Sequence, residues 1–226
     1  MKLSNELSIS TLIEIIRKVL HFNIFKAFYL RIVSLMNRLG AYGKRTNKYI
    51  DCFRPYVNNA KVIVDIGCGA GTFSKVIADG KRLIIALDIQ IKLLRGIEGP
   101  NIEKICADAH HLPFREKSID CALSISLMEH LEDPERHVKE LFTVLKPNGF
   151  LALQLPNLQY IFEPHSKWPL LGFLPKPFQL KVFEGISYGY VNMNVTVKHA
   201  LNLFKKANFT LRKAIKVYHL SVMKLL

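Results

Sequence analysis

Apolar and polar positions follow two different rhythms between residues 60 and 155. Short apolar runs, several of them β-branched, predict strands, and apolar residues spaced three and four apart predict helices. The predicted strands are 61–66, 82–88, 102–107, 118–126 and 149–155, and the predicted helices are 72–79 and 134–145. A further helix is expected over 196–207, and two more strands within 209–225. Strands that alternate with helices predict an α/β domain with a mainly parallel sheet.

The first forty residues have the pattern of two amphipathic helices, 8–21 and 22–39. In one straight helix their apolar faces would point in roughly opposite directions, so we expect a break near residues 21–23 and an end at Gly40. These helices either pack on the body or lie on a membrane surface. We predict an N-terminal amphipathic helical segment over 1–58 and an α/β domain over 59–226.

Residues 156–195 interrupt the alternation of strands and helices. They hold five of the ten prolines and eight of the 23 aromatic residues of the chain. A long insertion of this composition after a strand is typical of a lid or a binding wall. The alternative is a segment whose aromatic side chains pack only on one another.

Composition excludes several classes of protein. With 226 residues, 50% hydrophobic and 22% charged, the chain is expected to be globular rather than disordered or fibrous. It has no run of about 20 apolar residues, and Glu6 and Glu14 interrupt the first apolar stretch, which argues against a cleavable signal peptide. The four cysteines form no C-x-x-C pair, so we expect a cytoplasmic protein.

Positive charge is concentrated at the two ends of the chain. Residues 1–60 contain ten Lys and Arg against three acids, 61–190 contain fifteen of each, and 191–226 contain seven basic residues and no acid. Two basic ends around a neutral middle favour an anionic partner such as a membrane surface, a nucleic acid or a phosphorylated substrate. The alternative is a solubilising surface without a specific partner.

The strongest motif is Val64-Asp-Ile-Gly-Cys-Gly-Ala-Gly-Thr72, in which a predicted strand runs into a glycine turn and then a helix. Gly67 and Gly69 allow a tight turn and the close approach of a ligand, to which the next helix presents its first N–H groups. Dinucleotide-binding domains place glycines here as G-x-G-x-x-G, whereas this chain has G-x-G-x-G.

Two acids follow the next two predicted strands. Asp88, at the end of the second strand, can accept both hydroxyl protons of a ribose, and the alternative is a structural aspartate at a strand end. Asp108, after the third strand, can accept a proton from an adenine amino group, with Leu112 and Phe114 beside the ring.

These motifs together resemble those of the class I S-adenosylmethionine-dependent methyltransferases. Two later segments, 127–134 and 144–151, resemble the parts that follow the fourth strand and precede the fifth strand in that family. The resemblance covers about residues 60–157 and implies S-adenosyl-L-methionine as the cofactor. It also implies a Rossmann-like, doubly wound, mainly parallel sheet of seven strands with an antiparallel last strand, besides the N-terminal helices and the lid after the fifth strand.

Matched position by position, the resemblance assigns ten residues to the cofactor. The first four would surround its methionine part, the next two its ribose and adenine, the following two the adenine edge, and the last two the sulfonium. In this order they are Asp65, Gly67, Cys68, Gly69, Asp88, Ile89, Asp108, Ala109, Ser124 and Ile125. Arg45 is a weaker match, as a partner of the cofactor carboxylate.

Two histidines are candidates for a general base. His130 lies in a segment that resembles the ubiquinone-biosynthesis O-methyltransferases, and His165 lies in the predicted lid. The alternative for His130 is a residue that caps or packs the start of a helix. Some of those relatives have a metal-binding E-x-x-E-H sequence here, but Ser126 stands in place of its first glutamate, so we expect no metal site.

The leading hypothesis is a methyltransferase that acts at oxygen on a small or lipid-like acceptor, with peripheral contact to an anionic membrane. The main alternative is an RNA or protein methyltransferase whose basic ends bind its target. Nucleic acid is the less favoured partner because the chain has no recognisable RNA-binding domain. A third alternative, from a different class, is a scaffold that binds the cofactor without catalysing transfer.

Overall fold

The structure is a computed structural model that describes residues 41–155, 177, 195–215 and 220–225. The two predicted amphipathic helices and nearly all of the predicted lid, including His165, lie outside the described residues. The helices are α3 (Ala41–Val57), α4 (Thr72–Ile77), α5 (Ile91–Leu94), the 3-10 turn η1 (Met128–His130), α6 (Pro134–Val144) and α8 (Val197–Lys206). The strands are β1 (Val62–Ile66), β2 (Leu83–Asp88), β3 (Ile102–Cys106), β4 (Ile119–Ile125), β5 (Leu145–Gln154), β6 (Phe209–Ile215) and β7 (Leu220–Leu225).

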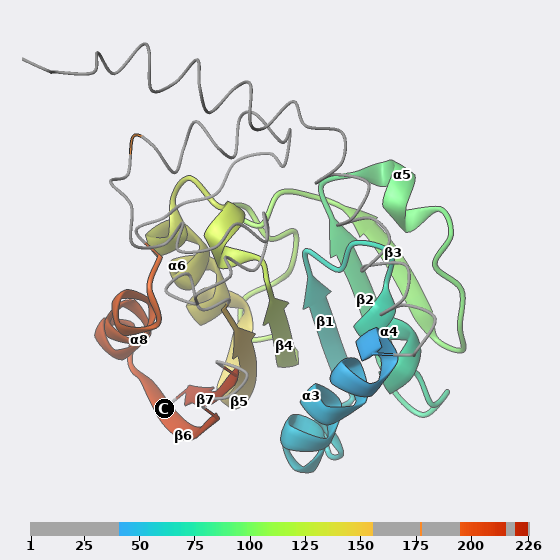
Figure 1. Ribbon diagram of the computed structural model, residues 1–226, viewed down its shortest axis with the longest axis horizontal. Coiled ribbons are helices and arrows are strands. Elements are labelled where there is room, and N and C mark those ends of the chain that lie inside the picture. Colours follow the sequence, from blue (N-terminus) through green and yellow to red (C-terminus); the bar gives the residue numbers. More distant parts are fainter. Residues whose placement is uncertain (1–40, 156–176, 178–194, 216–219, 226) are drawn as a thin grey trace, which may run out of the picture.

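These strands form one sheet in the order β3-β2-β1-β4-β5-β7-β6 (Figure 1). The first five strands along the chain pair in parallel, and β7 runs antiparallel to both β5 and β6. The order of the strands reverses at β1, since the chain runs outward to β3 on one side and to β4 and β5 on the other. The predicted α/β fold with a parallel sheet is therefore confirmed for β1 to β5.

Helices cover both faces of the sheet. On one face α3 buries Tyr49, Ile50 and Phe53 against strand residues such as Ile63 and Leu123. On the other face α6 and α8 pack against strand residues such as Val64 and Leu153, whose side chains point away from α3. The buried side chains of the two helices are Val138, Leu141, Val144, Ala200, Leu203 and Phe204. Because side chains alternate between the faces of a strand, continuous apolar runs such as 84–87 fill both layers.

Local chemistry explains where the two helices of the second face begin. The Asp133 carboxylate accepts a hydrogen bond from the N–H of Arg136 at 3.0 Å, and Pro134 occupies the first helical position of α6. Thr196 caps α8 in the same way by accepting from the N–H of His199 at 3.1 Å. Both helices therefore begin within one residue of their predicted starts.

Strand β5 differs from its prediction at its amino end. It begins at Leu145, directly after α6, whereas the strand was predicted to begin at Gly149. The pairing with β4 shifts register between Ile119 and Cys121, and Asn148 has a positive φ of 65°. Strand β5 pairs with β4 at Leu145 and again from Phe150 onward, so the strand includes residues 146–149, where the pairing is irregular.

The edge of the sheet at the amino ends of β1, β4 and β5 is fixed by one carboxylate. Asp120 accepts hydrogen bonds from the N–H groups of Lys61 and Val62 at 3.0 and 2.9 Å, and Lys146 Nζ lies 2.6 Å from its other oxygen. These contacts align three central strands at this edge. The opposite edge, where the strands end, is left for the glycine turn and the loops that carry the predicted site.

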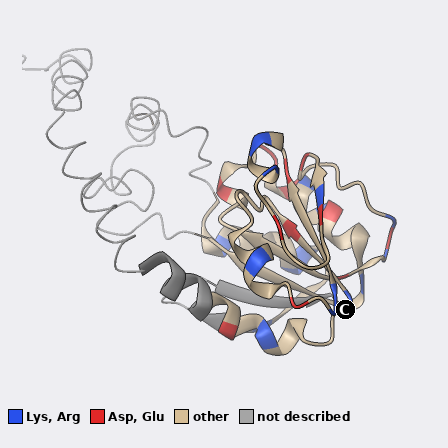
Figure 2. Ribbon diagram, turned by 90° about the vertical axis from the view of Figure 1, so that its right-hand side faces the viewer, with Lys and Arg blue, Asp and Glu red and all other residues tan. Residues whose placement is uncertain are grey.

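Positions of basic and acidic residues are interspersed along the coloured ribbon of the described residues in Figure 2. This agrees with the near-zero balance of residues 61–190 in the sequence. No helix among the described residues is long and apolar enough to cross a membrane.

Candidate functional site

The glycine turn joins β1 to α4 at the carboxyl edge of the sheet (Figure 1). The N–H groups of Gly67 and Cys68 both donate to the carbonyl of Leu87 in β2, at 2.8 and 3.0 Å. Gly67, Gly69 and Gly71 have φ values of 67°, 55° and 72°, which side chains rarely allow. The turn is thus held against the end of β2 in a conformation that requires glycine.

The three glycines differ in what surrounds them. A Cβ at Gly67 would lie 2.6 Å from a methyl carbon of Leu127, and one at Gly71 would lie 2.8 Å from Ile97. A Cβ at Gly69 would meet no described atom within 4 Å. Gly67 and Gly71 are therefore packed on the protein, whereas Gly69 leaves an open side on which a ligand can approach the backbone.

Asp88 lies at the end of β2, next to the glycine turn. One carboxylate oxygen accepts from the N–H of Gly69 at 2.8 Å, and the other accepts from the N–H of Gln90 at 2.8 Å. The residue is buried, with 7% of its surface exposed. Each oxygen keeps a second lone pair, so the oriented carboxylate can still accept hydrogen bonds from two hydroxyl groups of a ribose.

Asp65 lies within β1 and is 2% exposed. Its Oδ2 accepts from both the N–H and the hydroxyl of Ser74 in α4, at 3.1 and 2.6 Å. Burial raises the pKa of the Asp65 carboxyl to about 6, against the effect of the Ser74 hydrogen bonds, and the charge of Asp88 raises it further. A cation at this place would favour the ionised carboxylate.

The loop after β3 carries Asp108 and Ala109. Asp108 Oδ1 lies 2.8 Å from both the backbone nitrogen and Nδ1 of His110, and among the described residues hydrogen bonds reach this oxygen only. The hydrogen bond from the His110 N–H lowers the pKa of the Asp108 carboxyl, which is therefore ionised at neutral pH. The side chain of Asp108 is 43% exposed, so it can meet a ligand.

Helix α6 holds this loop through three side chains. Arg136 Nε donates to the carbonyl of His110 at 3.0 Å, His137 Nδ1 lies 3.0 Å from the carbonyl of Ala109, and Glu140 accepts from the N–H of Leu112 at 2.7 Å. Arg136 also contacts the ring of His111. Backbone groups at positions 109, 110 and 112 are thus fixed to α6 rather than to the sheet.

His137 is the most buried polar side chain of this set, with 0% exposure. Its second ring nitrogen, Nε2, lies 3.2 Å from the hydroxyl of Ser124 in β4. Burial lowers the pKa of the imidazole to about 4, so the ring is neutral at pH 7. The sequence prediction did not include Arg136, His137 or Glu140; the available signal was a histidine on the apolar stripe of the helix predicted over 134–145.

The predicted residues at the end of β4 face different surroundings. Ser124 is fully buried and its hydroxyl is directed to His137, whereas Ile125 is half-buried on the opposite layer. The next residue, Ser126, has a positive φ of 51° and contacts the buried side chain of Gln154 in β5. The chain therefore turns sharply after β4, at the same edge of the sheet as the glycine turn.

The other predicted residues are placed as follows. Ile89 follows Asp88 directly and is 65% exposed, so it can cover an apolar ring. Cys68 is half-buried, and burial raises the pKa of its thiol, which stays protonated. His130 ends η1 and is half-buried, and the preceding Glu129 is buried. His165 lies outside the described residues, as does the side chain of Arg45.

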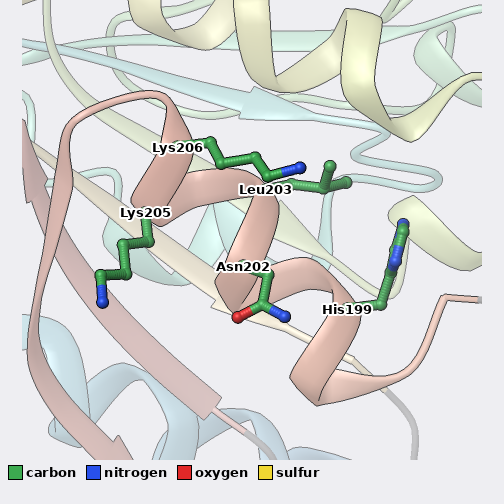
Figure 3. Close-up of a pocket in the computed structure, with 5 residues that line it drawn as sticks. All are labelled: His199, Asn202, Leu203, Lys205 and Lys206. Atoms are coloured by element: carbon green, nitrogen blue, oxygen red, sulfur yellow. The ribbon is translucent and has the colours of Figure 1, made fainter.

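Neither a metal site nor a pocket coincides with the predicted residues in the described part of the chain. That part contains no group of three His, Cys, Asp or Glu side chains that could hold a metal ion. A hollow of about 470 Å³ lies on α8, lined by His199, Asn202, Leu203, Lys205 and Lys206 (Figure 3). None of the predicted cofactor residues lines it, so it is separate from the carboxyl edge of the sheet.

The predicted residues fit S-adenosylmethionine on the geometry alone. Three carboxylates, Asp65, Asp88 and Asp108, lie at or just beyond the carboxyl ends of the adjacent strands β1, β2 and β3. Gly69, whose N–H donates to Asp88, has an open side next to that carboxylate. The order of the three acids along the sheet is the order in which a cationic amino acid part, a ribose and an adenine are linked in that molecule.

Comparison with known proteins agrees with this geometry. Residues 64–153 match a family model described as a methyltransferase domain. A Mycolicibacterium smegmatis protein named "Probable S-adenosylmethionine-dependent methyltransferase" is 30% identical over 113 residues, which cover 49% of this chain and 44% of that protein. The chain thus spans less than half the length of that relative.

A second relative and a solved structure extend the likeness. The ubiquinone/menaquinone biosynthesis C-methyltransferase UbiE of Haemophilus ducreyi is 28% identical over 213 residues, covering 83% of this chain and 78% of that protein. The crystal structure of a SAM-dependent methyltransferase from Methanosarcina mazei superposes with a TM-score of 0.58 at 20% identity, covering 77% of this chain and 97% of that one. At this identity the structural likeness shows the fold alone.

Proposed function

We propose that the whole protein transfers a methyl group from S-adenosyl-L-methionine to a small or lipid-like acceptor. Residues 64–153 match a methyltransferase domain, and the relative from Mycolicibacterium smegmatis is named as dependent on this cofactor. The observation that supports this most is the row of acids at the ends of β1, β2 and β3, with the open side of Gly69 next to Asp88. Each acid is oriented by N–H or hydroxyl donors of the protein itself.

The described residues act by binding and alignment. Asp88 would hold the ribose, Asp65 would lie near the cationic amino acid part, and the loop at 108–109 would contact the adenine. The bound cofactor supplies an electrophilic methyl group on a sulfonium. The acceptor atom then needs an in-line approach and protection from water more than it needs covalent help from the protein.

A general base is needed only where the acceptor is not ionised near pH 7. His130, at the end of η1, and His165, in the proposed lid, stay the candidates for this role. Transfer to oxygen is the outcome expected from the sequence, whereas the Haemophilus relative is named a C-methyltransferase. The structure of the methylated product distinguishes the two.

The lipid-like nature of the acceptor rests on two proposals about the sequence outside the described residues. The segment 156–195, rich in proline and aromatic residues, would form the wall of the acceptor site. The basic amphipathic helices predicted within 1–58 would bring a cytoplasmic enzyme to an anionic membrane surface. The name of the UbiE relative, a quinone-biosynthesis enzyme, supports an acceptor of this class.

The experiment that tests the proposal combines binding with transfer. Calorimetry with S-adenosylhomocysteine should give saturable binding to the purified protein. Methyl-tritiated S-adenosylmethionine, added with the protein to a lysate of the source organism, should then label material that partitions into organic solvent. Label in macromolecules that nuclease or protease releases would overturn the lipid-like acceptor in favour of RNA or protein, and binding without any transfer would favour a scaffold.

A further inference from the structure

We propose that His137 is a positioning residue, which holds the Ala109 carbonyl from α6 so that the loop at 108–109 is preset to read the edge of an adenine. This inference rests on the proposed function, since it concerns the same cofactor site. His137 is not one of the residues that the resemblance assigns, and its side chain is fully buried behind the loop rather than exposed to a ligand.

The hydrogen bonds of His137 fix its tautomer. The carbonyl of Ala109 can only accept, so the nitrogen 3.0 Å from it, Nδ1, must carry the proton. In the neutral ring Nε2 is then an acceptor, and the Ser124 hydroxyl at 3.2 Å donates to it. One side chain of α6 therefore connects the loop after β3 with the end of β4.

Burial, rather than nearby charge, keeps the His137 ring neutral. The titratable groups that act on the imidazole are on the loop, where His110 lowers its pKa and Asp108 raises it; β4 faces the ring with the neutral Ser124. Burial lowers the pKa of His137 to about 4, so the ring stays neutral across the physiological range. A neutral ring donates only through Nδ1, and the Ala109 carbonyl is the group that receives this bond.

The other contacts of α6 show why the position of Ala109 matters. Arg136 and Glu140 fix the loop at residues 110 and 112, which follow Ala109 along the chain. Before Asp108 along the chain, the N–H of Ala107 donates to the carbonyl of Asp88 in β2 at 3.2 Å. His137 supplies the hydrogen bond between these two anchors, at the residues that the proposed function places against the adenine.

Base discrimination tests this role more directly than affinity does. We would measure the dissociation constants of S-adenosylhomocysteine and S-inosylhomocysteine by calorimetry at pH 7.5, for the wild type, His137→Leu, His137→Asn and Ser124→Ala. The two ligands differ at one edge of the purine: the 6-amino donor of adenine is replaced by a carbonyl acceptor, and N1 changes from an acceptor to an N–H donor. Val144→Ala, a buried change at the other end of α6, is the matched control because it loses packing without touching the loop.

We expect the wild type to prefer the adenine ligand, and His137→Leu to lose about tenfold of this preference, the value of roughly one hydrogen bond to the base edge. His137→Asn, which keeps a donor near the position of Nδ1, should retain most of it, and Ser124→Ala should lose part of it. Val144→Ala should lower the melting temperature and leave the ratio unchanged. A residue that only stabilises the core would behave like this control.

Each outcome decides a different point. An unchanged ratio in folded His137→Leu and Ser124→Ala overturns the role of His137 and leaves the proposed function standing. Failure of the wild type to bind either ligand overturns the proposed function itself. If His137→Leu does not fold, the ¹⁵N spectrum of the wild-type imidazole decides instead: a proton on Nδ1 supports the proposal, and a proton on Nε2 overturns it.

Discussion

At the scale of single residues, three aspartates of one site have different environments and therefore different chemistry. Asp65 is buried and its pKa is raised to about 6, whereas the N–H of His110 lowers the pKa of Asp108. Asp88 is buried too, but backbone N–H groups donate to both of its oxygens. The sequence predicted the positions of the acids from the motifs, but their protonation depends on burial and donors that only the fold supplies.

Replacing Asp88 with alanine is expected to weaken the binding of S-adenosylhomocysteine by about 10- to 100-fold, which corresponds to the loss of a charged hydrogen-bond acceptor. The change also removes the acceptor for the Gly69 N–H, so the glycine turn loses its anchor. Calorimetry checks this, with Asp51→Ala as the control, because Asp51 is exposed and forms an ion pair with Arg54 on its own helix, α3. Equal affinities of the two variants would show that the ribose site is misassigned.

Cofactor binding is expected to weaken as the pH falls through about 6. In the free protein Asp65 takes up a proton near that pH, and a cationic ligand favours the ionised form, so protonation opposes binding. The dissociation constant should rise by at most about tenfold per pH unit between pH 6 and pH 4. Titrations at several pH values with the wild type and Asp65→Asn check this, and the same pH slope in both would contradict it.

At the scale of elements, the sequence predicted α6 correctly over almost its whole length but not its role. The apolar stripe of Val138, Leu141 and Val144 shows which face is buried, and Asp133 and Pro134 mark the start. That Arg136, His137 and Glu140 all contact one loop depends on how α6 lies across the sheet. Pairings between residues 26 to 28 positions apart have no local signature.

Besides the 3-10 turn η1, two described α-helices were absent from the sequence prediction. Helix α5 has only four residues, too few for a periodic pattern. Helix α3 falls inside the segment predicted as amino-terminal and basic, yet Tyr49, Ile50 and Phe53 are buried against the sheet. The division of the chain between residues 58 and 59 stays a proposal. The packing of α3 on the sheet shows that the core includes residues that precede this division.

Loss of the Glu140 carboxylate is expected to lower the free energy of unfolding by about 1–3 kcal/mol, because the N–H of Leu112 loses a charged acceptor in a half-buried place. Denaturant titration of Glu140→Ala measures this. The control is Glu135→Ala on the exposed side of the same helix, where the pair with Lys139 is well exposed and should contribute less than about 1 kcal/mol. Equal effects would mean that α6 does not hold the loop through Glu140.

The two buried titratable groups are expected to act in opposite directions on stability. His137 has a lowered pKa, so the stability that it allows is present above about pH 6.5 and is lost as the pH falls through about 4. Asp65 has a raised pKa, so its contribution is present below about pH 4 and is lost as the pH rises through about 6. In the wild type the two effects largely offset each other between pH 4 and pH 6.

Comparison of the wild type with His137→Asn separates these effects. The difference in their unfolding free energies should shrink by about 3 kcal/mol between pH 7 and pH 4, since only the wild type has a buried imidazole that resists protonation. Urea titrations at half-unit pH intervals measure it. A constant difference across this range would show that His137 takes up a proton in the folded protein as readily as in the unfolded chain.

At the scale of the whole molecule, the proposed cofactor site and most of the positive charge belong to different parts of the sequence. The site lies on the carboxyl edge of the sheet, within the part of the sequence that has no net charge, and the excess of basic residues belongs to the two ends of the chain. An anionic partner would therefore attract the molecule mainly through its ends and leave the cofactor site unaffected.

Association with anionic surfaces is accordingly expected to depend on salt, whereas cofactor affinity is not. Cosedimentation of the full chain with vesicles containing phosphatidylglycerol should be strong at 50 mM salt and fall steeply by 300 mM, and vesicles of phosphatidylcholine alone should bind little. Single-stranded RNA of similar charge is the competitor that separates a lipid from a nucleic acid partner. If RNA displaces the vesicles at an equal charge concentration and binds more tightly at 150 mM salt, the basic ends are suited to a nucleic acid. If instead the protein stays bound to the vesicles in the presence of RNA, and binding requires the anionic lipid, the basic ends are suited to a membrane surface. A membrane surface is also where a lipid-like acceptor would be found.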